Sequence, residues 1–255
     1  MIAGAARLEY RWFGPAAAEA PTLVFLHEGL GSAGLWREFP ARLAAATGCG
    51  AVTYSRAGYA GSDSAALPWP LDFMHREAEV LREVLAQLGV RQTVLFGHSD
   101  GASIALIHAG TAPWPGLRGL VLEAPHVFTE AHGLASIARI AEDYRDGDLR
   151  ERLRRHHGEN VDVAFHGWNG VWLDPGFRSW NIEGHLPAIR VPMLLVQGEA
   201  DEYGTWRQIE AIQAGADGPV EVLALPGCGH APHREAPEQV LAAASDFVRR
   251  ILADR

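Results

Sequence analysis

The fold of this chain is decided by residues 93–106, which read Thr-Val-Leu-Phe-Gly-His-Ser-Asp-Gly-Ala-Ser-Ile-Ala-Leu. The segment begins as an apolar, β-branched run and continues with helical spacing, so it predicts a strand, a sharp turn and a helix. Ser99 lies at the apex of this turn on a strained backbone. Gly97 and Gly101 are required because a Cβ at either position would clash where strand and helix pack closely. The pattern is that of a nucleophile elbow, in which the N–H of Asp100 at the helix start is free to donate to a developing oxyanion.

The composition of the 255-residue chain fits a single α/β domain. Hydrophobic residues make up 48% of it, which is enough to bury a sizeable core. The formal charge of −9, from 22 basic and 31 acidic residues, disfavours nucleic acid or an anionic membrane surface as a partner. No charged segment precedes an apolar one at the N-terminus and no run approaches 18 apolar residues, so we expect a cytoplasmic protein. Its oligomeric state, monomer or homodimer, stays open. Cys49 and Cys228 lie far apart without a Cys-x-x-Cys pattern, which predicts two free thiols.

Strand and helix patterns alternate along most of the chain. Residues 22–26, Thr-Leu-Val-Phe-Leu, form a continuous apolar run that is typical of a central strand buried on both faces. This run leads into residues 27–32, a glycine-rich loop at the carboxyl end of the sheet, where parallel sheets bind ligands. Such alternation indicates βαβ units and a parallel sheet. We expect an edge strand over 7–12, further strands over 51–54, 116–123, 191–198 and 219–225, and helices over 33–46, 73–88, 134–144, 149–157 and 237–252.

The alternation breaks between residues 126 and 189, where helical patterns occur without an apolar strand. An insertion of this kind is expected to form a helical cap over the carboxyl ends of the strands, with residues 1–125 and 190–255 forming the core. Its aromatic residues could hold the cap together or line a pocket, and in a pocket they would favour a medium-sized apolar or aromatic acyl group. Clefts between a sheet domain and its cover are preferred ligand sites. We therefore predict that at least one of three tryptophans contacts the substrate, namely Trp168, Trp172 and Trp180.

Three side chains with complementary chemistry follow three predicted strands, in the order Ser99, Asp201, His230. A serine hydroxyl is a weak nucleophile, so it needs an imidazole to take its proton, and the imidazole needs a carboxylate to fix its tautomer. Neighbouring residues offer a second acid and a second base, Glu202 and His233. We favour Asp201, since Glu202 would need a different backbone path to reach the imidazole. We favour His230, since its Gly-Cys-Gly turn can bend back over Ser99, whereas His233 is expected at the surface or as a helix cap.

Four short segments together resemble the α/β-hydrolase fold superfamily, and the resemblance extends from residue 22 to the last helix. The resemblance implies a mostly parallel sheet with helices on both faces and a helical cap inserted before the acid-bearing strand. It also implies that the N–H groups of Gly29 and Asp100 donate to the oxyanion and that Ser99 forms an acyl-enzyme. The matching segments are residues 27–31 as the oxyanion loop, 97–101 as the elbow, 198–201 as the acid turn and 229–230 as the base loop.

Two features depart from the pattern of the superfamily. Glu28 stands in the oxyanion loop where many relatives have glycine, which bears on the backbone path at the first oxyanion donor. The strand before Thr22 is single where relatives usually have a hairpin. The sheet is therefore expected to have seven or eight strands.

The nucleophile also selects the chemistry. Related dehalogenases and epoxide hydrolases use an aspartate at the apex, so Ser99 favours acyl transfer. We expect a serine hydrolase that cleaves a small-molecule carboxylic ester, lactone or thioester, with water as the final acceptor. One alternative is a carbon–carbon bond hydrolase of ring-opened aromatic catabolites, which would need a cationic side chain such as Arg56 or Arg178 in its pocket. Another, from a different class, is a non-catalytic small-molecule receptor on the same fold.

No metal or other cofactor is expected. His156 and His157 are adjacent in sequence and therefore point to different sides. His230 and His233 lack an acidic partner at metal-ligand spacing.

Overall fold

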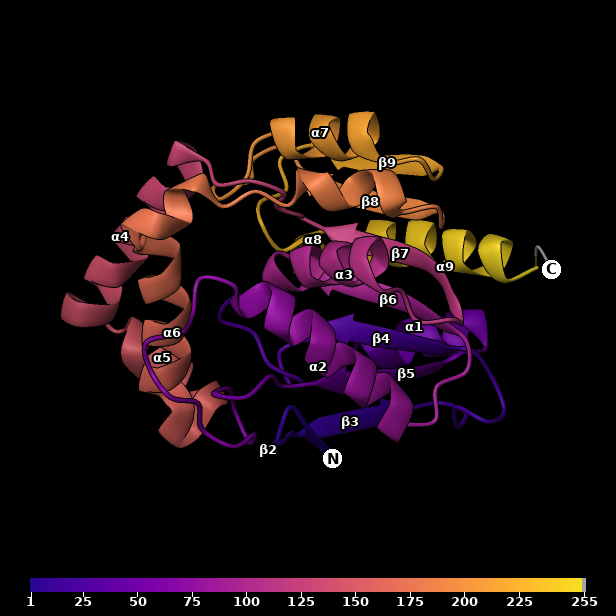
Figure 1. Ribbon diagram of the computed structural model, residues 1–255, viewed down its shortest axis with the longest axis horizontal. Coiled ribbons are helices and arrows are strands. Elements are labelled where there is room, and N and C mark those ends of the chain that lie inside the picture. The colour runs from indigo at the N-terminus through magenta and orange to yellow at the C-terminus, as the bar shows by residue number, and fades with distance from the viewer. Residues whose placement is uncertain (254–255) are drawn as a thin grey trace.

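A seven-stranded mixed sheet runs through the structure, a computed structural model that describes residues 1–253 (Figure 1). The strand order is β3-β5-β4-β6-β7-β8-β9, with β3 antiparallel to β5 and all other neighbours parallel. A short hairpin of β1 and β2 precedes the sheet. The chain has the expected α/β-hydrolase fold, with seven sheet strands. The strands are β1 (Ile2–Ala3), β2 (Ala6–Arg7), β3 (Tyr10–Phe13), β4 (Thr22–Leu26), β5 (Gly50–Tyr54), β6 (Thr93–His98), β7 (Leu117–Glu123), β8 (Met193–Gly198) and β9 (Val220–Leu225).

The central strands are buried on both faces, as their apolar runs predict. In β4, Leu23 packs into the core under one layer of helices and Val24 into the core under the other, because successive side chains point to opposite faces. The first layer consists of α1 (Phe39–Thr47) and α9 (Pro237–Ala253). The second consists of α2 (Phe73–Gln87), α3 (Asp100–Thr111) and α7 (Arg207–Gly215). The two layers hold the sheet rigid, so loops at its carboxyl end keep a fixed geometry.

The first helix is shorter than its pattern indicates. A helix is expected over 33–46, but α1 begins only at Phe39. Arg37 has a φ of 52°, a left-handed conformation that an α-helix cannot contain, and Pro40 then fits the first turn of the helix. Three α-helices without a predicted residue range are also present, α6 (Val161–Leu173), α7 and the short α8 (Pro232–Glu235).

Three helices lie together beyond the ends of the strands, on the left of Figure 1. They are α4 (Ala131–Asp146), α5 (Leu149–His157) and α6 (Val161–Leu173), and they pack against one another. We call them the α4–α6 layer. The short 3₁₀ helix η1 (Gly158–Asn160) joins α5 to α6, and η2 (Pro175–Ser179) and η3 (Glu183–Ala188) lead back to the sheet, where η3 packs on α3 and α7. Within residues 1–253 no helix combines the length and the apolar character needed to cross a membrane.

Candidate active site

Ser99 lies on the sharp turn between β6 and α3, as predicted for the nucleophile elbow. Its φ of 53° and ψ of −117° strain a non-glycine residue, and its side chain borders a cavity. A Cβ at Gly97 would come within 3.0 Å of the Ala102 backbone. A Cβ at Gly101 would come closer still to the backbone of Leu26. The close approach of β6, α3 and β4 therefore requires both glycines, for the steric reason given by the sequence.

Asp201 and His230 meet beyond the carboxyl ends of β8 and β9. His230 Nδ1 lies 2.8 Å from Asp201 Oδ1 and 3.0 Å from Oδ2. The carboxylate also accepts hydrogen bonds from the Tyr203 N–H at 2.8 Å and from the Gln197 side chain at 2.9 Å. Burial alone would raise the pKa of Asp201, but the imidazole and the Tyr203 N–H hold that pKa well below its usual value. Asp201 is therefore an ionised acceptor that orients the imidazole and leaves Nε2 of His230 for a reaction.

The second candidates for acid and base do not join this pair. The side chain of Glu202 is exposed. His233 was expected at the surface or as a helix cap, but it lies inside α8 and is buried, and its Nδ1 lies 2.6 Å from a carboxylate oxygen of Glu123. That expectation is wrong because α8 turns His233 inward, where its ring packs 4.6 Å from the ring of Trp36.

The backbone N–H groups predicted as oxyanion donors belong to residues that border the same cavity as Ser99, Gly29 from the loop after β4 and Asp100 from the start of α3. Within residues 1–253 neither N–H donates a hydrogen bond to another group. Asp100 also stands at the positive end of the α3 dipole. Free donors beside a nucleophile are what a developing oxyanion requires.

Glu28 and His98 connect the oxyanion loop with the elbow. Glu28 Oε2 lies 3.4 Å from His98 Nδ1, and Nε2 of His98 donates to the backbone carbonyl of His230 at 2.6 Å. Burial alone would lower the pKa of His98, but the Glu28 carboxylate raises it to about 9, so this imidazole is charged near neutral pH. Burial likewise opposes ionisation of Glu28, yet His98 keeps the pKa of that carboxyl well below its usual value. The residue that departs from the superfamily pattern thus takes part in a partly buried ion pair that contacts three loops of the site.

A second carboxylate–imidazole pair lies next to the first. One ligand atom each from His98, Glu123 and His233 lies within 4.8 Å of the others, a spacing that could suit a metal ion. Each carboxylate already has an imidazole partner, because Glu28 pairs with His98 and Glu123 pairs with His233. The group is therefore best described as two adjoining carboxylate–imidazole pairs beside the site.

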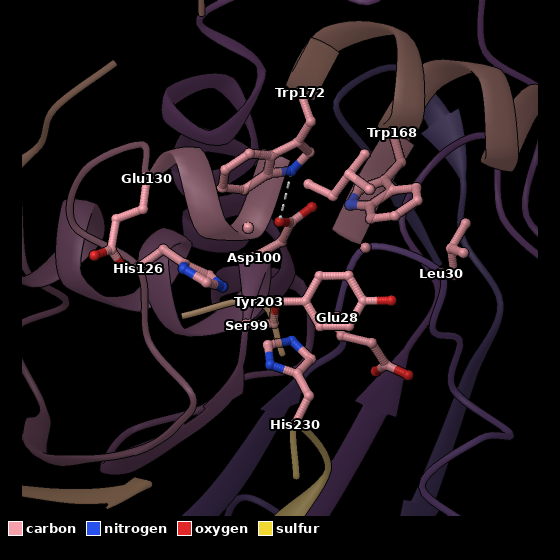
Figure 2. Close-up of a pocket in the computed structure, with 13 residues that line it drawn as sticks. Glu28, Leu30, Ser99, Asp100, His126, Glu130, Trp168, Trp172, Tyr203 and His230 are labelled. Carbon is pink, nitrogen blue, oxygen red and sulfur yellow. Dashed lines mark hydrogen bonds between the residues drawn. The ribbon is translucent and has the colours of Figure 1, made fainter. Parts of the chain in front are cut away.

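A cavity of about 100 Å³ lies between the sheet and the α4–α6 layer (Figure 2). Sites for drug-sized ligands measure about 300–1,000 Å³, so this cavity suits a short acyl group better than the medium-sized one that the tryptophans indicate. The Ser99 side chain and the His230 imidazole both face it, although no hydrogen bond joins them within the part of the chain that is described. The lining residues are Glu28, Gly29, Leu30, Ser99, Asp100, His126, Glu130, Gly133, Ile137, Trp168, Trp172, Tyr203 and His230.

Two of the three predicted tryptophans line this cavity. Trp168 and Trp172 both project from α6, and Trp172 Nε1 donates a hydrogen bond to Asp100 Oδ1 at 3.1 Å. Trp180 is not among the lining residues. Its ring stacks on Phe177 with centroids 5.2 Å apart and meets the ring of Trp172 at 5.8 Å. Trp180 therefore packs against Trp172 outside the cavity. Sequence composition cannot distinguish such a supporting tryptophan from one that lines the cavity.

Other lining residues had no prediction from the sequence. His126 follows β7 by three residues and Tyr203 follows Asp201 by two, so the rule that functional groups follow strands could have identified both. Burial lowers the pKa of His126 to about 4, so its imidazole is neutral at physiological pH. Glu130 stands at the start of α4, and no motif or strand end in the sequence marked it as a site residue.

Comparison with known proteins gives one family and one fold. Residues 23–244 match the family model described as the Alpha/beta hydrolase family, and no curated protein matches the sequence. A carboxylesterase structure from the thaumarchaeon Nitrososphaera gargenis is similar at a TM-score of 0.81 with 17% identity, covering 98% of this chain and 97% of that one. An esterase from Exiguobacterium antarcticum is similar at 0.74 with 19% identity and 96% of both chains covered. An esterase from a Rhodococcus species is similar at 0.72 with 18% identity, covering 97% and 96%. At these identities the likeness shows a common fold.

Proposed function

This chain belongs to the alpha/beta hydrolase family, and on that premise we propose that it is a serine hydrolase that cleaves a carboxylic ester of a small acid. The observation that carries the proposal is the 2.8 Å contact of His230 Nδ1 with Asp201, made at the cavity that Ser99 borders. The esterases among the similar structures support the same reaction class. We further propose that the α4–α6 layer is the cap predicted over 126–189.

The proposed reaction uses five groups. Ser99 Oγ attacks the ester carbonyl while His230 Nε2 takes its proton, and Asp201 holds the other ring nitrogen and stabilises the imidazolium. The N–H groups of Gly29 and Asp100 stabilise the oxyanion. His230 then passes the proton to the leaving alkoxide, which departs as the alcohol. Water, deprotonated by the same imidazole, attacks the acyl-enzyme and releases the carboxylic acid with Ser99 restored.

The position of the arginines disfavours the carbon–carbon bond hydrolase. Such an enzyme would need a cationic side chain to bind its acidic substrate. Arg56 lies behind the cavity wall, where it donates to the backbone carbonyl of His27 at 2.6 Å and to that of Glu28 at 3.2 Å. Arg178 is exposed on η2. Neither arginine is among the residues that line the cavity.

Covalent labelling tests the proposal. A fluorophosphonate should add once to the wild-type protein, at Ser99, and abolish turnover of p-nitrophenyl acetate. Ser99→Ala should take up no label and lose about 10³- to 10⁶-fold in kcat. Ser64→Ala, which removes an exposed hydroxyl, should behave like wild type. Turnover or labelling that survives in Ser99→Ala would refute the assignment, and labelling without turnover of any ester would favour the receptor.

A further inference from the structure

The side chain of Asp100 has a buried acceptor that the proposed reaction does not use. The residue is 0% exposed, and Figure 2 shows its carboxylate in the cavity beside the Trp172 and Trp168 rings. Oδ1 accepts the hydrogen bond from Trp172 Nε1. Oδ2 has no hydrogen-bond partner within residues 1–253. A buried carboxylate oxygen without a hydrogen bond is costly, so an oxygen of this kind on a cavity wall indicates a donor that arrives with the ligand.

Arg56 does not fill this role. Its Nη2 lies 3.8 Å from Asp100 Oδ2, which is an ion-pair distance but too long for a hydrogen bond. The same nitrogen donates to the backbone carbonyl of Glu28 and to the hydroxyl of Tyr59. Burial raises the pKa of Asp100, and Arg56 and Trp172 limit the rise to about 6. Arg56 therefore keeps Asp100 largely ionised at neutral pH and leaves the lone pairs of Oδ2 free.

The geometry of the site places Asp100 on the acyl side of the substrate. In Figure 2 Ser99 lies between the His230 imidazole and the Asp100 carboxylate. His230 must protonate the leaving oxygen, so the leaving group lies on its side of Ser99. The acyl group then extends from Ser99 towards Asp100.

The charge of the cavity wall fits a donor group. Three carboxylates border the cavity, those of Glu28, Asp100 and Glu130, and its lining includes no lysine or arginine. Glu28 lies 3.4 Å from His98, and Asp100 Oδ2 lies 3.8 Å from Arg56, but Oδ2 has no hydrogen-bond partner among residues 1–253. An acyl group with an N–H or O–H donor close to its carbonyl would satisfy that oxygen, and an anionic one would be repelled.

We infer that Asp100 Oδ2 accepts a hydrogen bond from an amino or hydroxyl group on the carbon next to the scissile carbonyl. The substrate would then be an ester of a small α-amino or α-hydroxy acid. This inference rests on the proposed serine hydrolase and names its substrate class.

Four methyl esters of similar size test the inference: lactate, alaninate, 2-methoxypropanoate and propanoate. Wild type should hydrolyse lactate, alaninate or both with a kcat/KM about 10- to 100-fold above that for propanoate, the range of one hydrogen bond to a charged acceptor. The methoxy ester, which has no donor, should be no better than propanoate. Preference for alaninate alone would identify an ammonium group as the donor, and preference for lactate alone a hydroxyl. Equal rates for all four esters would overturn the inference without any variant.

Asp100→Asn gives the second measurement. It retains the backbone N–H and the shape of the side chain, so the preference for the donor esters over propanoate should fall to within about threefold. Asp246→Asn, on the exposed side of α9, should keep the wild-type preference. A preference that persists in Asp100→Asn would refute the role of Asp100. If propanoate is cleaved and Ser99 is labelled, the proposed function stands whatever the outcome for Asp100, whereas no cleavage and no label would refute both.

Discussion

Replacing Gly29 by alanine should test the contact between the oxyanion loop and α6. A Cβ at this position would come within 3.0 Å of the Trp168 indole, including its Nε1 and Cδ1 atoms, whereas ordinary Cβ contacts lie at 3.4–4 Å. Trp168 supplies all three of the nearest atoms, and Gly29 does not have a left-handed φ. The change therefore keeps the backbone N–H and strains only the contact with Trp168.

The size of the effect follows from the cost of overpacking. Inserting one methyl group into a tightly packed contact costs about 1–3 kcal/mol. Both residues border the cavity, so this strain bears directly on the complex with the reacting ester. If the whole cost is expressed in the transition state, kcat/KM falls about 5- to 150-fold. The assay is the hydrolysis of p-nitrophenyl acetate, with the free energy of unfolding measured in parallel.

A double-mutant cycle with Trp168→Ala isolates the contact. Gly29→Ala should have little further effect once the indole is removed, which gives a coupling energy of about 1–3 kcal/mol. Gly170→Ala is the control, since a Cβ at this position on α6 has nothing within 4 Å. A Gly29→Ala enzyme with wild-type kcat/KM would refute the reasoning. A loss of equal size with and without the Trp168 indole would do so as well, because it would place the damage in the loop itself.

Three further predictions concern the base, the tryptophans and pH. His230→Ala should lose about 10³- to 10⁶-fold in kcat, and its loss of stability should be the smaller one because Asp201 keeps the hydrogen bonds from Tyr203 and Gln197. His233→Ala should lose about 3–5 kcal/mol of stability because it removes the hydrogen-bond partner of the buried Glu123 carboxylate. Kinetics and urea unfolding distinguish the two variants, and a stable, inactive His233→Ala would reverse the assignment. Trp172→Phe removes the hydrogen bond to the Asp100 carboxylate and should lower kcat/KM about tenfold. Trp180→Phe should mainly lower the melting temperature. The opposite pattern would show that Trp180 contacts the substrate. Burial raises the pKa of Glu77, on α2, to about 7 from 4.5, so the stability that its protonated form contributes is full below pH 4.5 and is lost as pH rises through 7. Glu77→Gln should therefore be more stable than wild type by about 3 kcal/mol at pH 8 and unchanged at pH 4. Equal urea midpoint shifts at both pH values would contradict this.

The parts of the site that depend on local geometry could be predicted from the sequence. Gly97 is required by the close approach of two consecutive elements, β6 and α3, and Gly101 by the approach of α3 to β4; one five-residue pattern includes both glycines. Asp201 and His230 lie just beyond strand ends, and apolar runs reveal where strands end. The positions of Asp201 and His230 after successive strands therefore predicted the contact between their side chains that the structure contains.

Single residues that override a pattern could not be foreseen. The helical spacing over 33–46 is real, yet the left-handed backbone at Arg37 delays the helix to Phe39. Likewise, the four residues of α8 are too few to show a helical period, and they decide that His233 is buried. Helix propensity is averaged over a window of many residues, whereas the start of α1 and the burial of His233 each depend on one or two positions.

Contacts between distant segments left no trace in a single sequence. Glu123 and His233 are 110 residues apart, and each taken alone looks like an ordinary polar residue at the end of an element. Only the three-dimensional structure shows that Glu28 meets His98 and that the two ion pairs adjoin. The departure of Glu28 from the superfamily pattern was visible, but its physical reason was not.

The two variable positions of the Gly-His-Ser-Asp-Gly elbow have different surroundings and so different consequences. His98, before the nucleophile, bonds the carbonyl of His230 and pairs with Glu28, so it acts on the loops that every substrate would use. Asp100, after the nucleophile, turns its carboxylate into the cavity and meets only the substrates that reach it. The inferred acyl preference therefore resides in a residue whose backbone N–H is also a proposed oxyanion donor. The start of α3 fixes that backbone, so the Asp100 carboxylate keeps a fixed position relative to the reacting carbonyl. A group that recognises a substituent on the neighbouring carbon requires such a fixed position.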